Sequence, residues 1–261
     1  INTLRKEKED FDRYRELDRV KSDFIANISH EIRTPLTLML TPVWAILDGS
    51  RAEAPDRELF EAIGRNGSRL LALINDLLDF SKLDAGRMNM KVAHADIVKL
   101  VRDHAAAVKS ACDLKHISVG ISSTSERVML YYDPEKMDSV MTNLFSNAIG
   151  FTGEGGRIEI RIDESNEEVR LEFEDNGCGI PGEDIDTIFD RFSQASTVRS
   201  GMPGGTGIGL ALVREFLDLH GGGITVESRH IRTHPDSHGT VFRIILPKGK
   251  TRYENREDVT F

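Results

Sequence analysis

SHEIRTPL (residues 29–36) stands in the middle of a segment that otherwise has the pattern of one long helix. A proline inside a helix removes a backbone hydrogen bond, and its ring presses on a carbonyl of the preceding turn. Pro35 therefore predicts a bend beside three chemically active side chains, His30, Glu31 and Thr34. Because the proline frees the carbonyl of Glu31, it makes the helix bendable next to the imidazole.

The residues on either side of this stretch predict a helical hairpin. Apolar residues within 4–28 are spaced by three, four or seven, which is the narrow stripe of a coiled-coil seam that pairs with its own copy. The helix continues to Leu47 with a second bend at Pro42, a turn follows at 48–56, and a second helix spans 57–83. Two antiparallel helices with one-sided apolar stripes are half of a four-helix bundle, so we expect a dimer with two helices per chain.

From about residue 88 the pattern changes to that of a separate α+β domain. Short runs of β-branched and aliphatic residues alternate irregularly with helical segments at 96–110, 134–149 and 207–219, and residues 157–174 are typical of an antiparallel hairpin. We therefore expect an α plus α+β protein in which helices cover one face of a single sheet. The expected units are an N-terminal coiled-coil helix (1–22), a dimerisation hairpin (23–87), an α+β domain (88–250) and a C-terminal tail (251–261).

Composition excludes several classes of protein. A hydrophobic fraction of 39% indicates a globular chain, and a net charge of −9 argues against a general nucleic-acid binder, which needs a basic face. Cys112 and Cys178 have the spacing of neither a disulfide framework nor a zinc site, which favours a reducing compartment. The sequence has no membrane span and no apolar signal region, so we expect a cytoplasmic fragment, attached to a membrane only through a region before it.

Two asparagines mark a candidate ligand site. Asn143 and Asn147 lie four residues apart and share one helix face. Asparagine is a poor helix-interior residue, so a stacked pair favours a polar ligand, and an amide oxygen suits magnesium. A solvated polar face is the alternative.

The run EFEDNGCGIP places Asp175 at the end of a strand, before Gly177 and Gly179, which permit a tight turn with positive φ. A buried carboxylate accepts hydrogen bonds and does not donate them, so Asp175 would bind the exocyclic amine of adenine and disfavour guanine. An ordinary hairpin turn is the alternative.

A glycine-rich stretch leads into the last helix, with glycines at positions 201, 204, 205, 207 and 209. Backbone amides and the positive end of the helix dipole would face an anion there, so a triphosphate could be held with little positive charge. Before it, IFDRFSQ (188–194) supplies two aromatics and Arg191, and residues 193–205 have almost no large apolar side chains, which predicts a mobile lid. A flexible linker, and core packing of Phe189 and Phe192, are the alternatives.

The neighbours of His30 favour a nucleophile over an ordinary surface histidine. Glu31 would hold the ring in one tautomer or accept its proton. Thr34 stands one turn further on the same face, where its hydroxyl would position a water. By contrast, His230, His234 and His238 indicate a polar loop instead of a metal site, because a proline and a glycine interrupt any helix there.

Five motifs in order resemble the cytoplasmic catalytic core of sensor histidine kinases of two-component systems, over residues 18–248: FIANISHEIRTPL, NLFSNAIGFT, DNGCGIP, IFDRFSQ and GGTGIGLAL. The resemblance implies a dimeric four-helix bundle followed by an α/β-sandwich ATPase domain of the gyrase, chaperone and histidine kinase type. It implies ATP-dependent phosphorylation of His30 with Glu31 as acid/base, and dephosphorylation of a response regulator assisted by Thr34. The residues it assigns to ATP are Asn143, Asn147, Asp175, Gly177, Gly179, Arg191, Gly205, Thr206, Gly207, Gly209 and Leu210, with Asn143 also on Mg²⁺. It implies two partners, a second copy of the chain and a receiver domain.

Gly150 departs from the family pattern, which customarily has a lysine or a similar phosphate-facing residue at this position. We therefore expect weaker ATP binding or slower turnover, and our hypothesis is that Arg191, with Arg199, partly compensates for Gly150. Ser139 also replaces a frequent glutamine. Three other functions fit parts of the sequence: a gyrase-like or chaperone ATPase, which has no need of His30, a dimeric scaffold with a degenerate nucleotide site, and a phosphatase-dominant homologue with weakened kinase activity.

Overall fold

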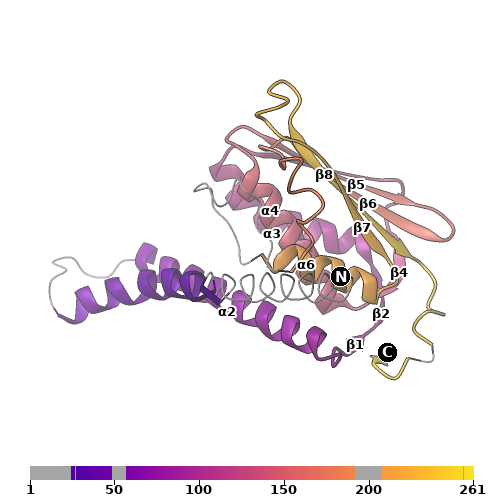
Figure 1. The fold of residues 1–261 in the computed structure, drawn as a ribbon, viewed down its shortest axis with the longest axis horizontal. Helices are drawn as coiled ribbons and strands as arrows, with labels where there is room; N and C mark the ends of the chain where they lie inside the picture. The colour runs from indigo at the N-terminus through magenta and orange to yellow at the C-terminus, as the bar shows by residue number, and fades with distance from the viewer. Residues whose placement is uncertain (1–24, 27, 49–56, 192–206, 255) are drawn as a thin grey trace, which may run out of the picture.

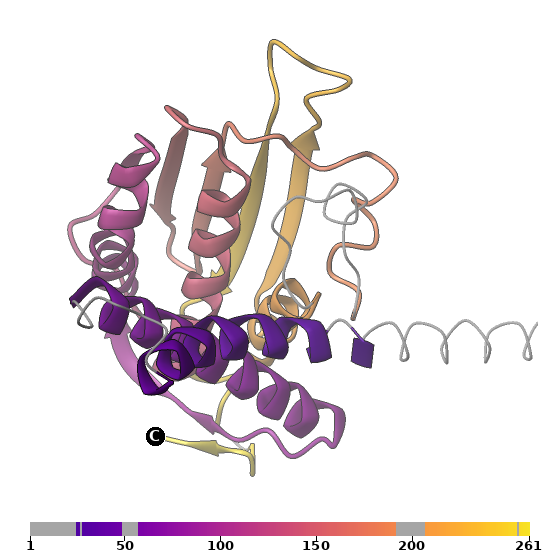
Figure 2. The same ribbon diagram turned by 90° about the vertical axis from the view of Figure 1, so that its left-hand side faces the viewer.

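The computed structural model describes residues 25–26, 28–48, 57–191, 207–254 and 256–261. A two-helix hairpin lies against an α/β domain, and the helices of that domain cover one face of its sheet (Figures 1 and 2). The expected coiled coil (1–22), the expected lid (193–205) and most of the expected turn at 48–56 lie outside the described residues. No helix in the described ranges is long and apolar enough to cross a lipid bilayer.

The hairpin leaves much of its apolar surface uncovered. Its first helix includes residues 28–47 and stays helical through Pro35 and Pro42, so neither proline interrupts it. Its second helix is α2 (Arg57–Asp84), of which Leu73 is the buried residue. The large exposed apolar side chains of the hairpin are Ile25, Leu36, Leu38, Trp44, Leu47, Phe60, Leu71, Ile74 and Leu78. Such a surface fits one half of a four-helix bundle.

The α/β domain is built on a five-stranded sheet. Its strands are β3 (Ser118–Ser123), β5 (Arg157–Glu164), β6 (Glu168–Asp175), β7 (Gly223–Arg229) and β8 (Gly239–Pro247). They lie in the order β3-β5-β6-β8-β7, with β3 and β5 parallel and the other neighbours antiparallel. The antiparallel hairpin expected within 157–174 is the pair β5–β6, so that prediction is confirmed.

Three helices cover one face of this sheet, as the sequence predicts: α3 (Ile97–Leu114), α4 (Pro134–Phe151) and α6 (Gly209–Leu219). The alternation of strand residues explains the arrangement, because Ile158, Ile160 and Ile162 of β5 are all buried toward the helices. The residues between them face outward, where Arg161 pairs with Glu174 of β6 at 2.7 Å.

Helix α4 is fixed at its start by a buried aspartate. Asp133 caps the helix by accepting hydrogen bonds from the backbone nitrogens of Glu135 and Lys136, at 3.0 and 3.2 Å. Its second oxygen accepts from the backbone nitrogen of Lys91 at 2.6 Å and from the ammonium of Lys136 at 3.0 Å. Burial raises the pKa of this carboxyl, but these hydrogen bonds outweigh burial and the net pKa is lowered. The cap therefore holds a charged group that orients α4.

The described residues of the expected C-terminal tail (251–261) pack against the segment that follows the hairpin. Tyr253 is buried against Met90 and Val92 in a small second core. Strand β9 (Val259–Thr260) pairs in parallel with β1 (Met90–Lys91), directly after the hairpin. A further short pair joins β2 (Ala93–Asp96) to β4 (Met129–Tyr132) in antiparallel fashion. The physical reason is that the apolar residues after the hairpin need a cover, which Tyr253 supplies.

Candidate functional site

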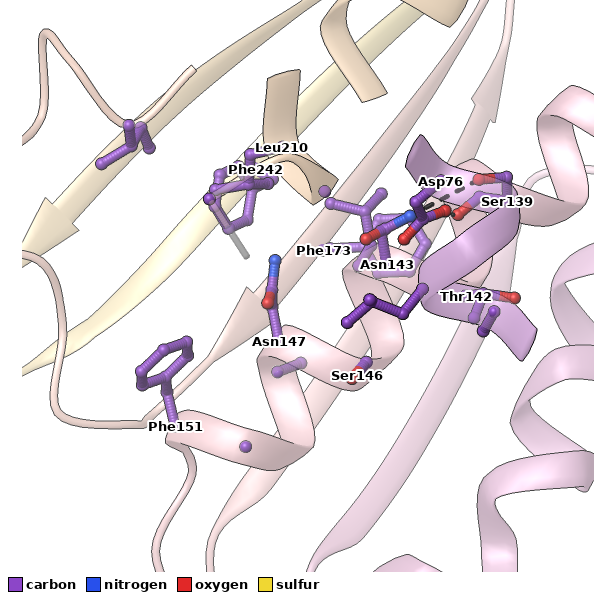
Figure 3. Close-up of a pocket in the computed structure, with 18 of the residues that line it drawn as sticks. Asp76, Ser139, Thr142, Asn143, Ser146, Asn147, Phe151, Phe173, Leu210 and Phe242 are labelled. Carbon is purple, nitrogen blue, oxygen red and sulfur yellow. Dashed lines mark hydrogen bonds between the residues drawn. The ribbon is translucent and has the colours of Figure 1, made fainter. Parts of the chain in front are cut away.

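A cavity of about 970 Å³ lies between the hairpin and the α/β domain. Its walls come from the first helix, α2, α4, the start of α6 and the adjoining ends of β6 and β8. Its volume is at the upper end of the range for small-molecule sites. Figure 3 shows Asn143 and Asn147 on the same side of α4, with Leu210 and Phe242 above them and Asp76 of α2 nearby. The helix face predicted from the spacing of the two asparagines therefore forms part of this cavity.

The amide of Asn143 is oriented by its own helix. Its Nδ2 donates to the carbonyl oxygen of Ser139 at 3.0 Å, which leaves Oδ1 directed to the start of α6. A Cβ built on Gly209 would lie 2.2 Å from that oxygen, so only glycine fits there. Gly207 has φ of +72°, a left-handed conformation that favours glycine. These two glycines and Leu210 line the cavity where the last helix begins.

Asp175 also lines the cavity. It is 8% exposed at the end of β6, and its Oδ1 accepts from the backbone nitrogen of Gly177 at 2.9 Å. Burial raises its pKa to about 6, although the hydrogen bonds from the backbone of Gly177 and Thr240 lower it. The buried carboxylate predicted from the sequence is therefore present, with an unusually strong tendency to accept a hydrogen bond or a proton.

The two glycines after Asp175 are required for different reasons. Gly179 has φ of +71°, as predicted, and a Cβ there would lie 2.1 Å from the carbonyl oxygen of Arg229. The prediction of positive φ is wrong for Gly177. Glycine is needed at that position because a Cβ would lie 2.5 Å from the carbonyl oxygen of Phe151.

Sequence reasoning missed the role of the loop between β7 and β8. Nδ1 of His238 donates to the carbonyl oxygen of Gly177 at 2.5 Å. The backbone nitrogen of Ile231 donates to the carbonyl oxygen of Cys178 at 2.8 Å. The loop therefore clamps the turn that follows Asp175. Within the described residues, no group of three histidine, cysteine or carboxylate side chains is placed to hold a metal.

The hairpin contributes one wall of the cavity, which the sequence did not predict. The charged residues of this wall are Glu31 from the first helix and Arg69, Asp76, Asp79 and Lys82 from α2. Burial raises the pKa of Glu31, and the charge of Arg69 opposes that rise. Burial, and then the charge of Asp79, raise the pKa of Asp76 to about 6. The sequence did contain a signal for this wall: Arg69 and Asp76 are charged, lie seven positions apart and stand beside an apolar stripe.

His30 and Thr34 are exposed on the first helix, and the cavity is lined by the adjacent Glu31. The hydroxyl of Thr34 donates to the carbonyl oxygen of His30 at 3.1 Å, so the two residues share one face as predicted. The imidazole itself is not among the lining residues. Reaction at His30 with a ligand in the cavity therefore requires the imidazole and the cavity to come closer together.

Arg191 is not where the sequence hypothesis needs it. Its guanidinium donates to Asp84 at 2.7 Å and to Glu215 at 2.9 Å, and it lies 5.3 Å from the ring centroid of Phe80. It does not line the cavity, because these carboxylates hold it between the last residue of α2 and helix α6. Gly205, Thr206 and Arg199, the other expected phosphate contacts, lie outside the described residues.

The charges of the lining residues bear on what the cavity can hold. The carboxylates are Glu31, Asp76, Asp79, Glu135, Asp138, Glu174 and Asp175, and the cations among the described lining residues are Arg69 and Lys82. A polyphosphate here would need a divalent cation and backbone amides to offset repulsion. The free amide oxygen of Asn143 is a ligand type that Mg²⁺ accepts, so the residues fit a magnesium-bound nucleotide.

Comparisons with known proteins agree with this geometry. Residues 20–86 match the family model of the His Kinase A (phospho-acceptor) domain, and residues 132–250 that of the Histidine kinase-, DNA gyrase B-, and HSP90-like ATPase. The Hybrid signal transduction histidine kinase D of Dictyostelium discoideum is 35% identical over 223 residues, and Sensor protein SrrB of Staphylococcus aureus is 34% identical over 233 residues. These matches cover 84% and 89% of this chain.

This chain spans only 14% and 39% of the lengths of those two relatives. Among solved structures, full-length ShkA in complex with AMPPNP superposes with a TM-score of 0.62 and 26% identity. That match covers 86% of this chain and 45% of the ShkA chain.

Proposed function

Since the chain belongs to the sensor histidine kinase family of two-component systems, as its catalytic core, we propose that it transfers phosphate from ATP to His30 and then to an aspartate of a response regulator. The observation that carries this proposal is the contact between the amide oxygen of Asn143 and Gly209. It places a magnesium-compatible oxygen at an amide-rich helix start, inside a cavity walled by the helix that bears His30.

Each part of the nucleotide has a matching group in the cavity. The Asp175 carboxylate accepts from the exocyclic amine of adenine, which guanine lacks at that position. Gly207 and Gly209 allow the phosphates to approach the first amides of α6. Asn143 and Asn147 would hold Mg²⁺ and the nucleotide, and the ion would neutralise phosphate charge when bound. The relative ShkA carries a nucleotide analogue in its crystal structure, which supports this assignment. Gly205, Thr206, Gly177, Gly179 and Leu210 remain proposed nucleotide contacts on the family resemblance.

The transfer step is a displacement at the γ-phosphorus. A lone pair on one ring nitrogen of His30 forms the N–P bond while the bond from phosphorus to the bridging oxygen of ADP breaks, and ADP leaves with that electron pair. The proton on the other ring nitrogen passes to Glu31, so the ring of the product is uncharged and the phosphoryl group keeps its negative charge. Burial raises the pKa of Glu31, which makes its carboxylate a better proton acceptor.

The remaining parts of the proposal concern partners. The exposed apolar side chains of the hairpin would be covered by a second copy of the chain, which completes the four-helix bundle. The exposed face of His30 and Thr34 would then meet a receiver domain, where the Thr34 hydroxyl positions a water for dephosphorylation of the regulator. A cytoplasmic location fits two cysteines that are both free thiols.

Incubation with γ-labelled ATP and Mg²⁺ tests the kinase proposal. We expect acid-labile, base-stable label on the wild type and none on His30→Gln, with His234→Gln in an exposed loop as the matched control that keeps the label. Mass spectrometry under conditions that spare phosphoramidates should locate the label at His30. A wild type that binds ATP but never carries label on His30 contradicts the kinase.

The acidic lining and Gly150 favour one alternative, a dimeric scaffold with a degenerate nucleotide site. A dimer that does not bind ATP at millimolar concentration would support the scaffold. If Thr34→Ala instead abolished the dominant activity, the protein would be mainly a phosphatase of its partner.

A further inference from the structure

The cations that line the described cavity all come from the hairpin. From α4 to β6 the α/β domain supplies six asparagine, aspartate and glutamate side chains to the described lining, but no lysine or arginine. At the position where the family customarily has a basic residue stands Gly150, which also lines the cavity. The terminal phosphate of a bound nucleotide therefore needs a cation from elsewhere.

Lys82 and Arg69 are the two cations available, and only one of them is unengaged. Lys82 donates to its neighbour Asp79 at 3.0 Å, three residues earlier on α2. Among the described residues, the guanidinium of Arg69 forms no hydrogen bond or ion pair, and it acts on Glu31 through its charge alone. Arg69 thus lies in the cavity wall with its donors available.

The position of Arg69 on α2 makes it a cavity residue. Arg69, Leu73 and Asp76 are three to four residues apart, so they share one helix face, and all three line the cavity. Arg65, one turn earlier, is not a lining residue and lies 3.9 Å from Glu61. The same helix therefore provides an arginine that faces the cavity and a matched arginine that does not.

We propose that Arg69 binds the terminal phosphate of ATP from the hairpin side. It would take the place of the basic residue that the family customarily has at position 150, where this chain has Gly150. A guanidinium presents a planar fork of donors that matches phosphate oxygens, and it stays charged at all working pH values. Because Glu31 lies close enough to sense the charge of Arg69, the arginine brings the γ-phosphate to the helix that carries His30. This inference rests on the proposed function, in that the cavity must hold ATP.

The proposal has a consequence for nucleotide preference. ADP lacks the phosphate that Arg69 would bind, so ATP should bind more tightly than ADP, and the difference should come from the hairpin. Once the γ-phosphate has moved to the imidazole, that contact is lost and ADP is released more easily.

Binding measurements on the full chain test the role of Arg69. Titration calorimetry with Mg²⁺ and either a non-hydrolysable ATP analogue or ADP gives the ratio of the two affinities. We expect Arg69→Gln to weaken the ATP analogue about tenfold or more and to change ADP affinity less than about twofold. Arg69→Lys should lie between, because it keeps the charge and loses the fork. Arg65→Gln is the control and should change neither affinity.

An Arg69→Gln variant with the wild-type ratio of ATP to ADP affinity would overturn the assignment, and equal weakening of both nucleotides would also do so. Thermal melting without nucleotide shows whether Arg69→Gln is folded. If it is not, Arg69→Lys is used in its place for the same affinity measurements. The binding assay needs no phosphoryl transfer. If His30 of the wild type never becomes labelled, the kinase proposal is contradicted and the Arg69 binding result still stands. If His30 is labelled but Arg69→Gln leaves the ratio of ATP to ADP affinity unchanged, only the Arg69 assignment is contradicted.

Discussion

Arg191 joins the two parts of the molecule: its Nη1 donates to Oδ1 of Asp84, at the last residue of α2, over 2.7 Å. Its Nη2 donates to Glu215 of α6 over 2.9 Å, and its guanidinium lies over the ring of Phe80. One side chain of the α/β domain thus contacts the end of the hairpin through charge and through an aromatic ring. The groups are partly exposed, so each pair contributes only about 0–1 kcal/mol.

Arg191→Ala should therefore loosen the connection between hairpin and domain without changing the nucleotide cavity. We expect ADP affinity within about twofold of wild type, and cleavage by trypsin at the exposed Arg87 that is several-fold faster. Limited proteolysis followed by gel electrophoresis measures the rate. Arg243→Ala, which removes an arginine of similar exposure from the outer face of the sheet, should leave it unchanged. A tenfold loss of ADP affinity in Arg191→Ala would instead support the compensation for Gly150 suggested by the sequence.

Asp175→Asn should stabilise the nucleotide-free protein at neutral pH. Burial raises the pKa of Asp175 from 3.8 to about 6, so the folded state binds more protons than the unfolded state between these values. Stability is therefore lost as pH rises toward 6, by on the order of 2–3 kcal/mol at most. The variant should melt above wild type at pH 7.5, and the gap should narrow below pH 6 and close near pH 4.

The same pair of proteins tests the role of Asp175 in binding. ADP should raise the melting temperature of wild type and not that of Asp175→Asn, because the amide offers a donor where adenine also presents one. A variant that is less stable than wild type at pH 7.5 would show that the carboxylate is needed for the turn at Gly177.

Gly209→Ala should weaken nucleotide binding through sterics alone. The added Cβ would lie 2.2 Å from Oδ1 of Asn143, so the amide must turn away from the start of α6. We expect at least tenfold weaker binding of Mg²⁺–ADP by calorimetry, with the far-ultraviolet circular dichroism unchanged. Gly182→Ala is the matched control, because no atom lies within 4 Å of its added Cβ. Unchanged affinity in Gly209→Ala would mean that Asn143 does not contact the ligand.

Gly150→Lys should strengthen ATP binding. Nothing lies within 4 Å of a Cβ there, the residue is in the last turn of α4, and it lines the cavity. A lysine adds charge beside the phosphates, which predicts roughly a five- to tenfold tighter complex. Gly150→Gln separates charge from helix propensity: it should raise thermal stability by about as much as lysine and leave ATP affinity near wild type. Equal affinity in both variants would argue against an unmet need for charge.

Local patterns accounted for the elements that carry the site. The spacing of Asn143 and Asn147 and the strand end at Asp175 follow from periods of 3.6 and 2, which depend on near neighbours only. The helix boundaries of α2 and α4 were predicted within two residues for the same reason. The clusters in these segments were therefore assigned correctly to helix, strand end and helix start.

Contacts between distant segments could not be predicted in this way. Strands β1 and β9 are two residues long, too short for any period, and they exist because Tyr253 covers apolar residues after the hairpin. Arg191 was assigned to the nucleotide because it precedes the glycines, whereas the carboxylates that hold it come from α2 and α6. The hairpin wall of the cavity was missed because sequence periods do not show which faces of two domains meet.

The parallel pairing of Met90 with Val259 has a practical meaning for anyone handling the protein. Figure 2 shows the C-terminus beside the strand that follows the hairpin, so a purification handle or fluorescent reporter fused behind Phe261 would lie close to the linker between the hairpin and the α/β domain. Mass added there would hinder movement between the hairpin and the α/β domain, which the proposed transfer to His30 would need.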